Sequence, residues 1–154
     1  MVLVTGISGS GKSTVLAELA RRGHHVLDTD CGSWTHEVRS ADGSVDHRWD
    51  EDRMGALLAQ DGAGTLFVSG CVSNQGTFYD RFDAVVLLSA PVQVLLQRIA
   101  SRTSNDYGKD PAELRRILHD RDTVQPLLRQ GATAEIDTRR PVQEVADAVE
   151  AFAR

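Results

Sequence analysis

The strongest constraint on the fold of this chain is a glycine-rich run near its start. Residues 6–13 read Gly-Ile-Ser-Gly-Ser-Gly-Lys-Ser and fit the pattern G-x-x-x-x-G-K-[ST] at every position. A short β-branched run, residues 2–5, comes before it, and an amphipathic run, residues 12–22, comes after it. A buried strand, a tight turn and a helix are the context that this pattern requires, so the sequence predicts a phosphate-binding loop.

This loop predicts both a ligand and its contacts. Glycines let successive backbone N–H groups converge on phosphate oxygens, and the following helix presents its positive end to the same anion. Lys12 is expected to reach the β- and γ-phosphates, and Ser13 to bind Mg²⁺. We therefore expect a nucleoside triphosphate, ATP, together with Mg²⁺. The nucleotide-binding residues of this segment would be Gly6, Ser8, Gly9, Ser10, Gly11, Lys12, Ser13 and Thr14.

Size and charge limit the protein classes that remain. At 154 residues, the chain is expected to form one domain, residues 1–154, with a proper core. The formal net charge of −5 comes without a basic block, which argues against nucleic acid as the main partner. No apolar run approaches the ~20 residues that span a bilayer. The first residues lack the charged start of a secretory signal, so we expect no membrane contact and a cytoplasmic location. The composition indicates no oligomeric state.

Apolar runs alternate with helical patterns along the chain. Strands are expected at residues 2–5, 24–30, 65–70, 83–90 and 133–137, and helices at residues 12–22, 46–60, 91–102, 110–130 and from 141 on. Pro126 should kink or split the fourth helix, and residues 31–46 show little periodicity. This alternation predicts an α/β fold with three layers, α/β/α, around a five-stranded parallel sheet. Ligands would bind at the carboxyl ends of the strands.

Two acids follow the second predicted strand. Asp28 and Asp30 are two residues apart, so on a continuing strand both carboxylates would point to the same side. They would lie at the sheet edge that carries the phosphate-binding loop. One carboxylate is suited to hold the water shell of a metal ion, and the other to take a proton from a phosphate acceptor.

Other parts of the chain separate it from several classes of nucleotide-binding protein. Switch GTPases read guanine with Asn-Lys-x-Asp, which is absent from this sequence. Motor-type and AAA-type ATPases end a hydrophobic strand in an acid. Here the corresponding apolar runs end in Ser69-Gly70 and Ser89-Ala90.

The phosphate-binding loop and the pair Asp28 and Asp30 resemble the small P-loop kinases of the shikimate kinase, gluconate kinase and adenylate kinase group. The resemblance spans nearly the whole chain and implies a P-loop NTPase fold with strand order 2-3-1-4-5, numbered along the chain. It also implies that Asp28 organises Mg²⁺ and that Asp30 contacts the acceptor hydroxyl as its base. Lys12, Asp30 and Arg102 would then be the catalytic residues.

The same resemblance extends to arginines in the second half of the chain. Arg98 and Arg102 are four residues apart, so on a helix they share one face. In this kinase group one such arginine stacks on adenine and the other reaches the phosphates from a lid, here residues 103–109. The run Thr138-Arg139-Arg140 resembles the loop that reads adenine, so these residues would flank the base.

On the acceptor side the resemblance is weaker. The triple glycine of shikimate kinases and the DG(F/Y)PR motif of adenylate-type kinases are both absent, so shikimate and AMP lose support as acceptors. The acceptor would bind to residues 31–60 and to the loop after the third strand. The predicted acceptor-binding residues are Asp30, Trp34, Arg53, Asn74, Gln75 and Arg121, with His36, Arg39, Trp49 and Cys71 as further candidates. For the arginine that follows the lid, Arg115, Arg116 and Arg129 are alternatives to Arg121.

Together these features predict an ATP-dependent kinase that transfers the γ-phosphate to a hydroxyl, or to a phosphate, of a small acceptor. A nucleoside or nucleoside monophosphate kinase is one alternative. A nucleotide-binding regulator without phosphate transfer is another, and Asp30 and the lid arginines argue against it.

Overall fold

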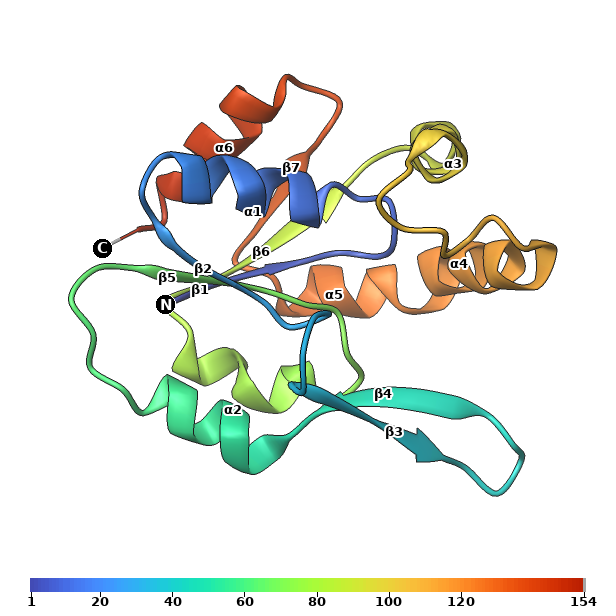
Figure 1. Cartoon of the computed structure of the whole chain (residues 1–154), viewed down its shortest axis with the longest axis horizontal. Helices are drawn as coiled ribbons and strands as arrows, with labels where there is room; N and C mark the ends of the chain where they lie inside the picture. Colours follow the sequence, from blue (N-terminus) through green and yellow to red (C-terminus); the bar gives the residue numbers. More distant parts are fainter. Residues whose placement is uncertain (154) are drawn as a thin grey trace.

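The computed structural model describes residues 1–153 as one three-layer α/β/α domain (Figure 1). A five-stranded parallel sheet forms the middle layer, with strand order β2-β5-β1-β6-β7. This is the predicted order 2-3-1-4-5, because β3 and β4 lie outside the sheet. The five strands are β1 (Val2–Thr5), β2 (His25–Asp28), β5 (Leu66–Ser69), β6 (Ala84–Ser89) and β7 (Ala134–Asp137).

Helices cover both faces of the sheet. On one face lie α1 (Lys12–Arg21) and α6 (Val142–Glu150), and on the other α2 (Glu51–Leu58), the 3₁₀ helix η1 (Gln75–Arg81) and α5 (Gln125–Gly131) (Figure 1). Side chains alternate along β1: Val2 and Val4 pack with α1 and α6, while Leu3 packs with Trp49 and Phe78. The sheet is therefore buried on both faces, as expected of parallel strands.

Two further helices stand beyond the carboxyl edge of the sheet. They are α3 (Val92–Ser101) and α4 (Pro111–Thr123). The Asp110 side chain caps α4 by accepting a bond of 2.8 Å from the Ala112 N–H. The chain leaves α4 after Thr123 and enters α5 at Gln125, next to Pro126. The predicted break of this helix by proline is confirmed.

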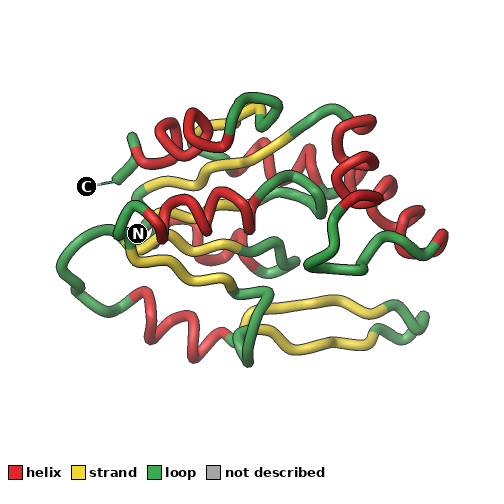
Figure 2. Tube along the Cα trace, turned by 45° about the horizontal axis from the view of Figure 1, so that its top comes forward, coloured by secondary structure: helices red, strands yellow, loops and turns green. Residues whose placement is uncertain are grey.

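A two-stranded hairpin corrects the prediction for residues 46–60. Its strands are β3 (Thr35–Arg39) and β4 (Val45–Trp49), and it extends away from the sheet as a separate arm (Figure 2). Its turn contains Asp42 and Gly43, with Gly43 in the left-handed region at φ 84°. An Asp-Gly pair favours a hairpin turn. The helical prediction relied instead on the charged residues from Asp46 onwards. The helix itself, α2, begins at Glu51.

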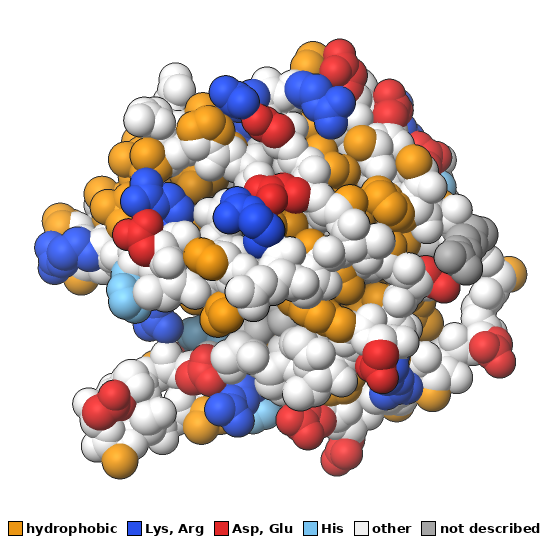
Figure 3. All heavy atoms as spheres, turned by 180° about the vertical axis from the view of Figure 1, so that it is seen from behind, with side chains coloured by type: hydrophobic (Ala, Val, Ile, Leu, Met, Phe, Trp, Pro, Cys, Tyr) orange, Lys and Arg blue, Asp and Glu red, His pale blue; other side chains and the backbone are white. Residues whose placement is uncertain are grey.

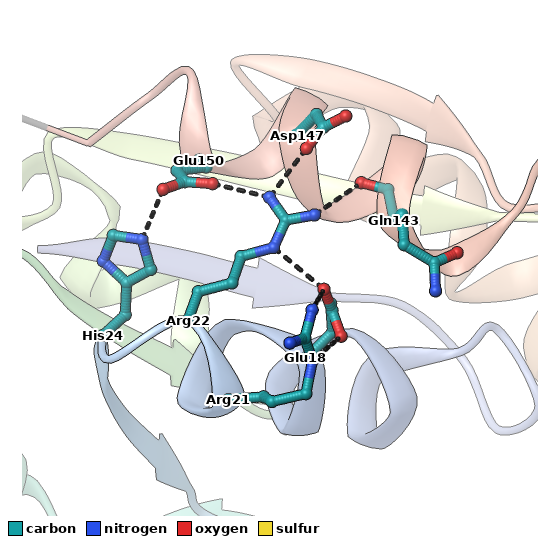
Figure 4. Close-up of polar contacts among 7 residues, drawn as sticks. All are labelled: Glu18, Arg21, Arg22, His24, Gln143, Asp147 and Glu150. Carbon is teal, nitrogen blue, oxygen red and sulfur yellow. Dashed lines mark hydrogen bonds and ion pairs between the residues drawn. The ribbon is translucent and has the colours of Figure 1, made fainter.

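A charged network ties α1 to α6 at the end of α1 that lies away from the phosphate-binding loop (Figure 4). Arg22 is at its centre. Its guanidinium donates to Glu18 at 2.9 Å and to Asp147 and Glu150 at 2.7 Å each. His24 lies 2.6 Å from Glu150. The network therefore fixes α1 at its C-terminal end, while the phosphate-binding loop lies at its N-terminal end.

Across residues 1–153, every helix is too short or too polar to cross a membrane.

Candidate active site

A cavity opens at the carboxyl edge of the sheet, next to the start of α1. Its volume is about 450 Å³, which lies in the usual range for small-molecule sites. The loop and the first turn of α1 line it with Ser8, Gly9, Gly11, Lys12, Ser13 and Thr14. Segments distant in the sequence contribute Asp30, Arg98, Arg102, Thr138 and Arg140. The structure thus gathers most of the predicted nucleotide-binding residues around one cavity.

The glycine-rich loop has the backbone that an anion-binding turn needs. Gly9 and Gly11 have φ angles of 83° and 101°, which side-chain-bearing residues rarely adopt. A Cβ on Gly6 would come within 2.5 Å of the Leu88 carbonyl oxygen. No side chain caps the start of α1, so its first N–H groups are available to an anion.

Two of the predicted contacts within the glycine-rich loop do not line the cavity. Gly6 and Ser10 are buried below the loop, and the Ser10 Oγ has no hydrogen-bond partner among the described residues. The Ser10 carbonyl accepts a bond of 2.9 Å from Thr138 Oγ1. These residues shape the loop, while their neighbours face the cavity.

Lys12 lies against the loop. Its Nζ donates to the Gly6 carbonyl at 2.6 Å and to the Ile7 carbonyl at 3.4 Å. Lys12 also lines the cavity, so its ammonium group lies where an anion in the cavity could reach it.

The two acids after β2 have different environments. The prediction that both stand on one strand is wrong, because β2 ends at Asp28 and a turn holds Asp30. Asp28 Oδ1 accepts a bond of 3.0 Å from the Asp30 N–H, so the first acid orients the turn that presents the second. Asp30 lines the cavity with Lys12, and Asp28 is absent from its wall.

The electrostatics of Asp30 follow from this position. Although the residue is exposed to solvent, protein around its carboxyl group raises the pKa by desolvation. The Lys12 ammonium opposes this effect and the Asp28 carboxylate adds to it. A carboxylate that shares a cavity wall with the Lys12 ammonium and has a raised pKa has the properties of a general base.

Arg98 and Arg102 reach the cavity from the end of α3, as predicted. Arg98 Nη1 donates to Gly9 O at 3.2 Å and to Thr138 Oγ1 at 2.8 Å. Arg102 Nε donates to Asn105 O at 3.0 Å, and its Nη2 lies 3.4 Å from Ser8 Oγ. Arg98 thus links the loop before α1 to the loop after β7, and Arg102 links the same loop to the predicted lid.

The two arginines after β7 separate. Arg140 lines the cavity. Arg139 instead forms an ion pair with Asp137, where its Nε lies 2.9 Å from Oδ2. Of the two, only Arg140 lines the cavity, so the prediction of a nucleotide contact remains for Arg140.

The predicted aromatic and arginine contacts for an acceptor lie outside this cavity. The Arg53 guanidinium stacks 4.1 Å from the centre of the Trp34 ring and donates to Ser33 O at 3.1 Å. Arg121 Nη2 pairs with Asp122 at 2.8 Å on the surface of α4. These groups already have partners within the protein.

The predicted polar contacts after β5 are part of the scaffold. Gln75 is 2% exposed. Its Nε2 donates both hydrogens, to Thr5 at 3.0 Å and to Tyr79 at 2.8 Å. Asn74 holds the end of β4 by accepting from the Trp49 N–H at 2.9 Å and donating to its carbonyl at 3.1 Å. Trp49 itself is fully buried. Asn74, Gln75 and Trp49 thus bind other parts of the protein, and the prediction that they contact an acceptor has no support in this structure.

The metal prediction has partial geometric support. Ser13 lines the cavity, whereas Asp28 does not line it and is linked to it through its bond to the Asp30 N–H. Within residues 1–153, no group of three or more His, Cys, Asp and Glu side chains is arranged to hold a metal ion.

Sequence reasoning missed the histidine at the hairpin, His47, and left Arg116 open as an alternative to Arg121. His47 on β4 interacts electrostatically with Asp30. Arg116 on α4 donates to the Val45 carbonyl at 2.9 Å. The Asp-Gly pair in its turn was the sequence signal for this hairpin. Pairing its two strands would have indicated that His47 shares a face of the hairpin with Trp49.

Comparisons with known proteins agree with this geometry. Residues 2–119 match the model of a family described as AAA domain. A shikimate kinase from Acinetobacter baumannii in complex with shikimate has a TM-score of 0.64 at 20% identity, covering 96% of this chain and 89% of that one. A gluconokinase from Sinorhizobium meliloti 1021 has a TM-score of 0.61 at 22% identity, covering 98% and 89%. No curated protein matched the chain.

A shikimate kinase from Bacteroides thetaiotaomicron is similar over 98% of this chain and 96% of that one, with a TM-score of 0.63 at 16% identity. Identities this low show a shared fold. The sequence predicts that the chain is separate from AAA-type ATPases because β5 ends in a serine and not in an acid, and β5 does end at Ser69. The match to the AAA domain model over residues 2–119 overturns that separation. The chain belongs to the AAA domain family and has the fold of the small P-loop kinases.

Proposed function

We propose that this protein is an ATP-dependent kinase that transfers the γ-phosphate to a hydroxyl group of a small acceptor. The observation that carries the proposal is that Lys12 and Asp30 line the same cavity, next to a glycine-rich loop with the sequence of a phosphate-binding loop. Lys12 would neutralise charge on the transferring phosphate, and Asp30 would take the proton of the attacking hydroxyl.

The nucleotide would bind along the loop and α3. Backbone N–H groups at the uncapped start of α1 would bind its phosphates. Arg102 would approach the phosphates from the lid side, and Arg98 and Arg140 would lie nearer to the base. Catalysis by these groups consists of positioning and charge neutralisation.

Mg²⁺ fits the oxygen groups near this wall. Ser13 is the expected direct contact, and Asp28 the expected contact through water. When bound, the ion would neutralise charge on the β- and γ-phosphates. Asp28 has a second task that needs no metal, because it holds the turn that carries Asp30.

The experiment is a screen for an acceptor, followed by a matched pair of variants. ADP release is measured with sugars, polyols, nucleosides and nucleoside monophosphates. Asp30→Asn should lower the transfer rate by about 10² to 10⁴, the range for a positioned general base. Asp52→Asn, an exposed acid in the first turn of α2, is the control and should keep the wild-type rate.

Two outcomes would defeat the proposal. If Asp30→Asn transfers phosphate as fast as Asp52→Asn, Asp30 is not the base. If ATP binds tightly and no acceptor accelerates ADP release, the protein is a nucleotide-binding regulator instead.

A further inference from the structure

The hairpin is anchored to the rest of the protein along one edge of β4. Three successive outward-facing backbone positions are bonded there. Asn74 accepts from the Trp49 N–H and donates to the Trp49 carbonyl. The Ser73 N–H donates to His47 O at 3.1 Å, and Arg116 donates to Val45 O at 2.9 Å. An edge strand would otherwise expose these groups. The orientation of the hairpin is therefore set by the body of the protein.

The register of the hairpin decides which side chains share a face. Glu37 is opposite His47, Arg39 is opposite Val45, and Thr35 is opposite Trp49. Directly opposed residues project to the same face of an antiparallel pair. Positions two apart on a strand also share a face. The face that carries the buried Trp49 therefore also carries Glu37 and His47, and we call it the inner face.

The inner face is directed to the carboxyl edge of the sheet. Trp49 Nε1 donates to Thr29 Oγ1 at 2.9 Å, one residue before Asp30. His47, the next position outward on this face, interacts with the Asp30 carboxylate. Figure 3 shows a notch between the projecting hairpin and the part of the molecule with α3 and α4. Basic and histidine side chains lie on the walls of this notch.

The opposite face of the hairpin has different neighbours. His36 is paired with Arg48 there, and Asp46 on the same face bonds Ser73 Oγ at 2.6 Å. Both histidines of the hairpin are exposed. His36 and His47 lie on opposite faces of the hairpin. A substitution at His36 is therefore a matched control for the same substitution at His47.

We propose that the inner face of the hairpin, with Glu37 and His47 at its centre, is the acceptor-recognition surface and takes a hydroxyl-rich acceptor without a negative charge. This inference rests on the proposed kinase function and names its substrate class. The acceptor would lie between this face and Asp30, with its reacting hydroxyl at Asp30.

The charges near Asp30 argue for an uncharged acceptor. The Asp28 carboxylate acts on Asp30, Glu37 adds a carboxylate to the inner face opposite His47, and a bound nucleotide would add further negative charge while it engages Lys12. The Arg53 guanidinium stacks on Trp34 and bonds Ser33, and Arg121 pairs with Asp122. Neither arginine lines the cavity with Asp30.

Arg116 reaches the outer end of β4 from α4, where it bonds Val45 O. Arg39 is the cation among the inner-face side chains themselves, and it stands one position farther out than Glu37, at the end of β3. It lies at the rim of the proposed acceptor site. Carboxylates are good partners for hydroxyl groups because they accept hydrogen bonds from them, and an imidazole can donate to a hydroxyl group or accept from it.

The test measures ADP release from the full chain with Mg²⁺ and ATP. The uncharged acceptors are glucose, sorbitol and myo-inositol, and the anionic ones are gluconate, glucuronate and shikimate. An uncharged acceptor should give the highest kcat/KM. Glu37→Gln and His47→Gln should then raise its KM by about tenfold or more, as for loss of a hydrogen bond to a charged group. The dissociation constant of ATP should not change.

His36→Gln is the control and should leave the acceptor KM at the wild-type value. The inference is overturned if an anionic acceptor is preferred, or if His36→Gln and His47→Gln change KM equally. Either result leaves the kinase function standing. If ATP binds and none of the six compounds is phosphorylated, the kinase function fails with these acceptor classes, and this inference falls with it.

Discussion

At the scale of single residues, Glu18 shows how a charge is held in the scaffold. Its side chain is 8% exposed, and both Arg21 and Arg22 bind it. Hydrogen bonds from Arg21 first, and then from Arg22, lower the pKa of Glu18 from its ordinary value of 4.5 to about 2. The ionised carboxylate is therefore the form that the folded state prefers.

This shift predicts the pH dependence of stability. A folded-state pKa below the unfolded value stabilises the fold above the unfolded pKa, and this contribution is lost as protons bind. The contribution of Glu18 should thus be complete above pH 4.5 and should disappear as the pH falls towards about 2. Denaturant unfolding at several pH values should show that Glu18→Gln is less stable than wild type near pH 6. The difference should shrink below pH 4.5, and a constant difference would contradict the assignment.

At the scale of elements, the hairpin depends on contacts that are distant in the sequence. Arg116 on α4 holds the outer end of β4, 71 residues away. Asn74 and Ser73 hold its inner end. Arg116 is therefore a positioning residue, which orients the inner face without contact to the reacting atoms.

Arg116→Ala should loosen the outer half of the hairpin and raise the acceptor KM, with little change in kcat or in the dissociation constant of ATP. Arg116→Lys keeps a donor of similar reach and should recover part of the affinity. Hydrogen exchange should show faster exchange at residues 35–39 and 45–47 in Arg116→Ala. Equal KM values for wild type and Arg116→Ala would show that this bond does not orient the site.

The elements also explain which predictions succeeded. The loop at residues 6–13 and the pair Arg98 and Arg102 follow from local spacing, because a turn and a helix bring together residues close in sequence. The hairpin and the internal roles of Asn74 and Gln75 depend on partners such as Thr5 and Trp49. Those contacts exist only after β1, β4 and β5 have come together, so local patterns could not reveal them.

At the scale of the whole molecule, the fold brings four distant segments to one cavity. The loop before α1, the turn after β2, the end of α3 and the loop after β7 all meet at the carboxyl edge of the sheet. Parallel strand order makes this convergence a consequence of the topology. The proposed acceptor side adds the hairpin, whose strands lie outside the parallel sheet and whose position depends on contacts distant in the sequence.

The most direct test of the central claim is calorimetric titration of the protein with Mg²⁺ and ATP. We expect one nucleotide per chain, and Lys12→Ala should weaken binding by about tenfold or more because a charged phosphate contact is lost. Lys109, the other lysine of the chain, pairs with Asp106 at 3.4 Å outside the cavity. Lys109→Ala should therefore bind like wild type. No binding by the wild type, or equal binding by wild type and Lys12→Ala, would contradict the account.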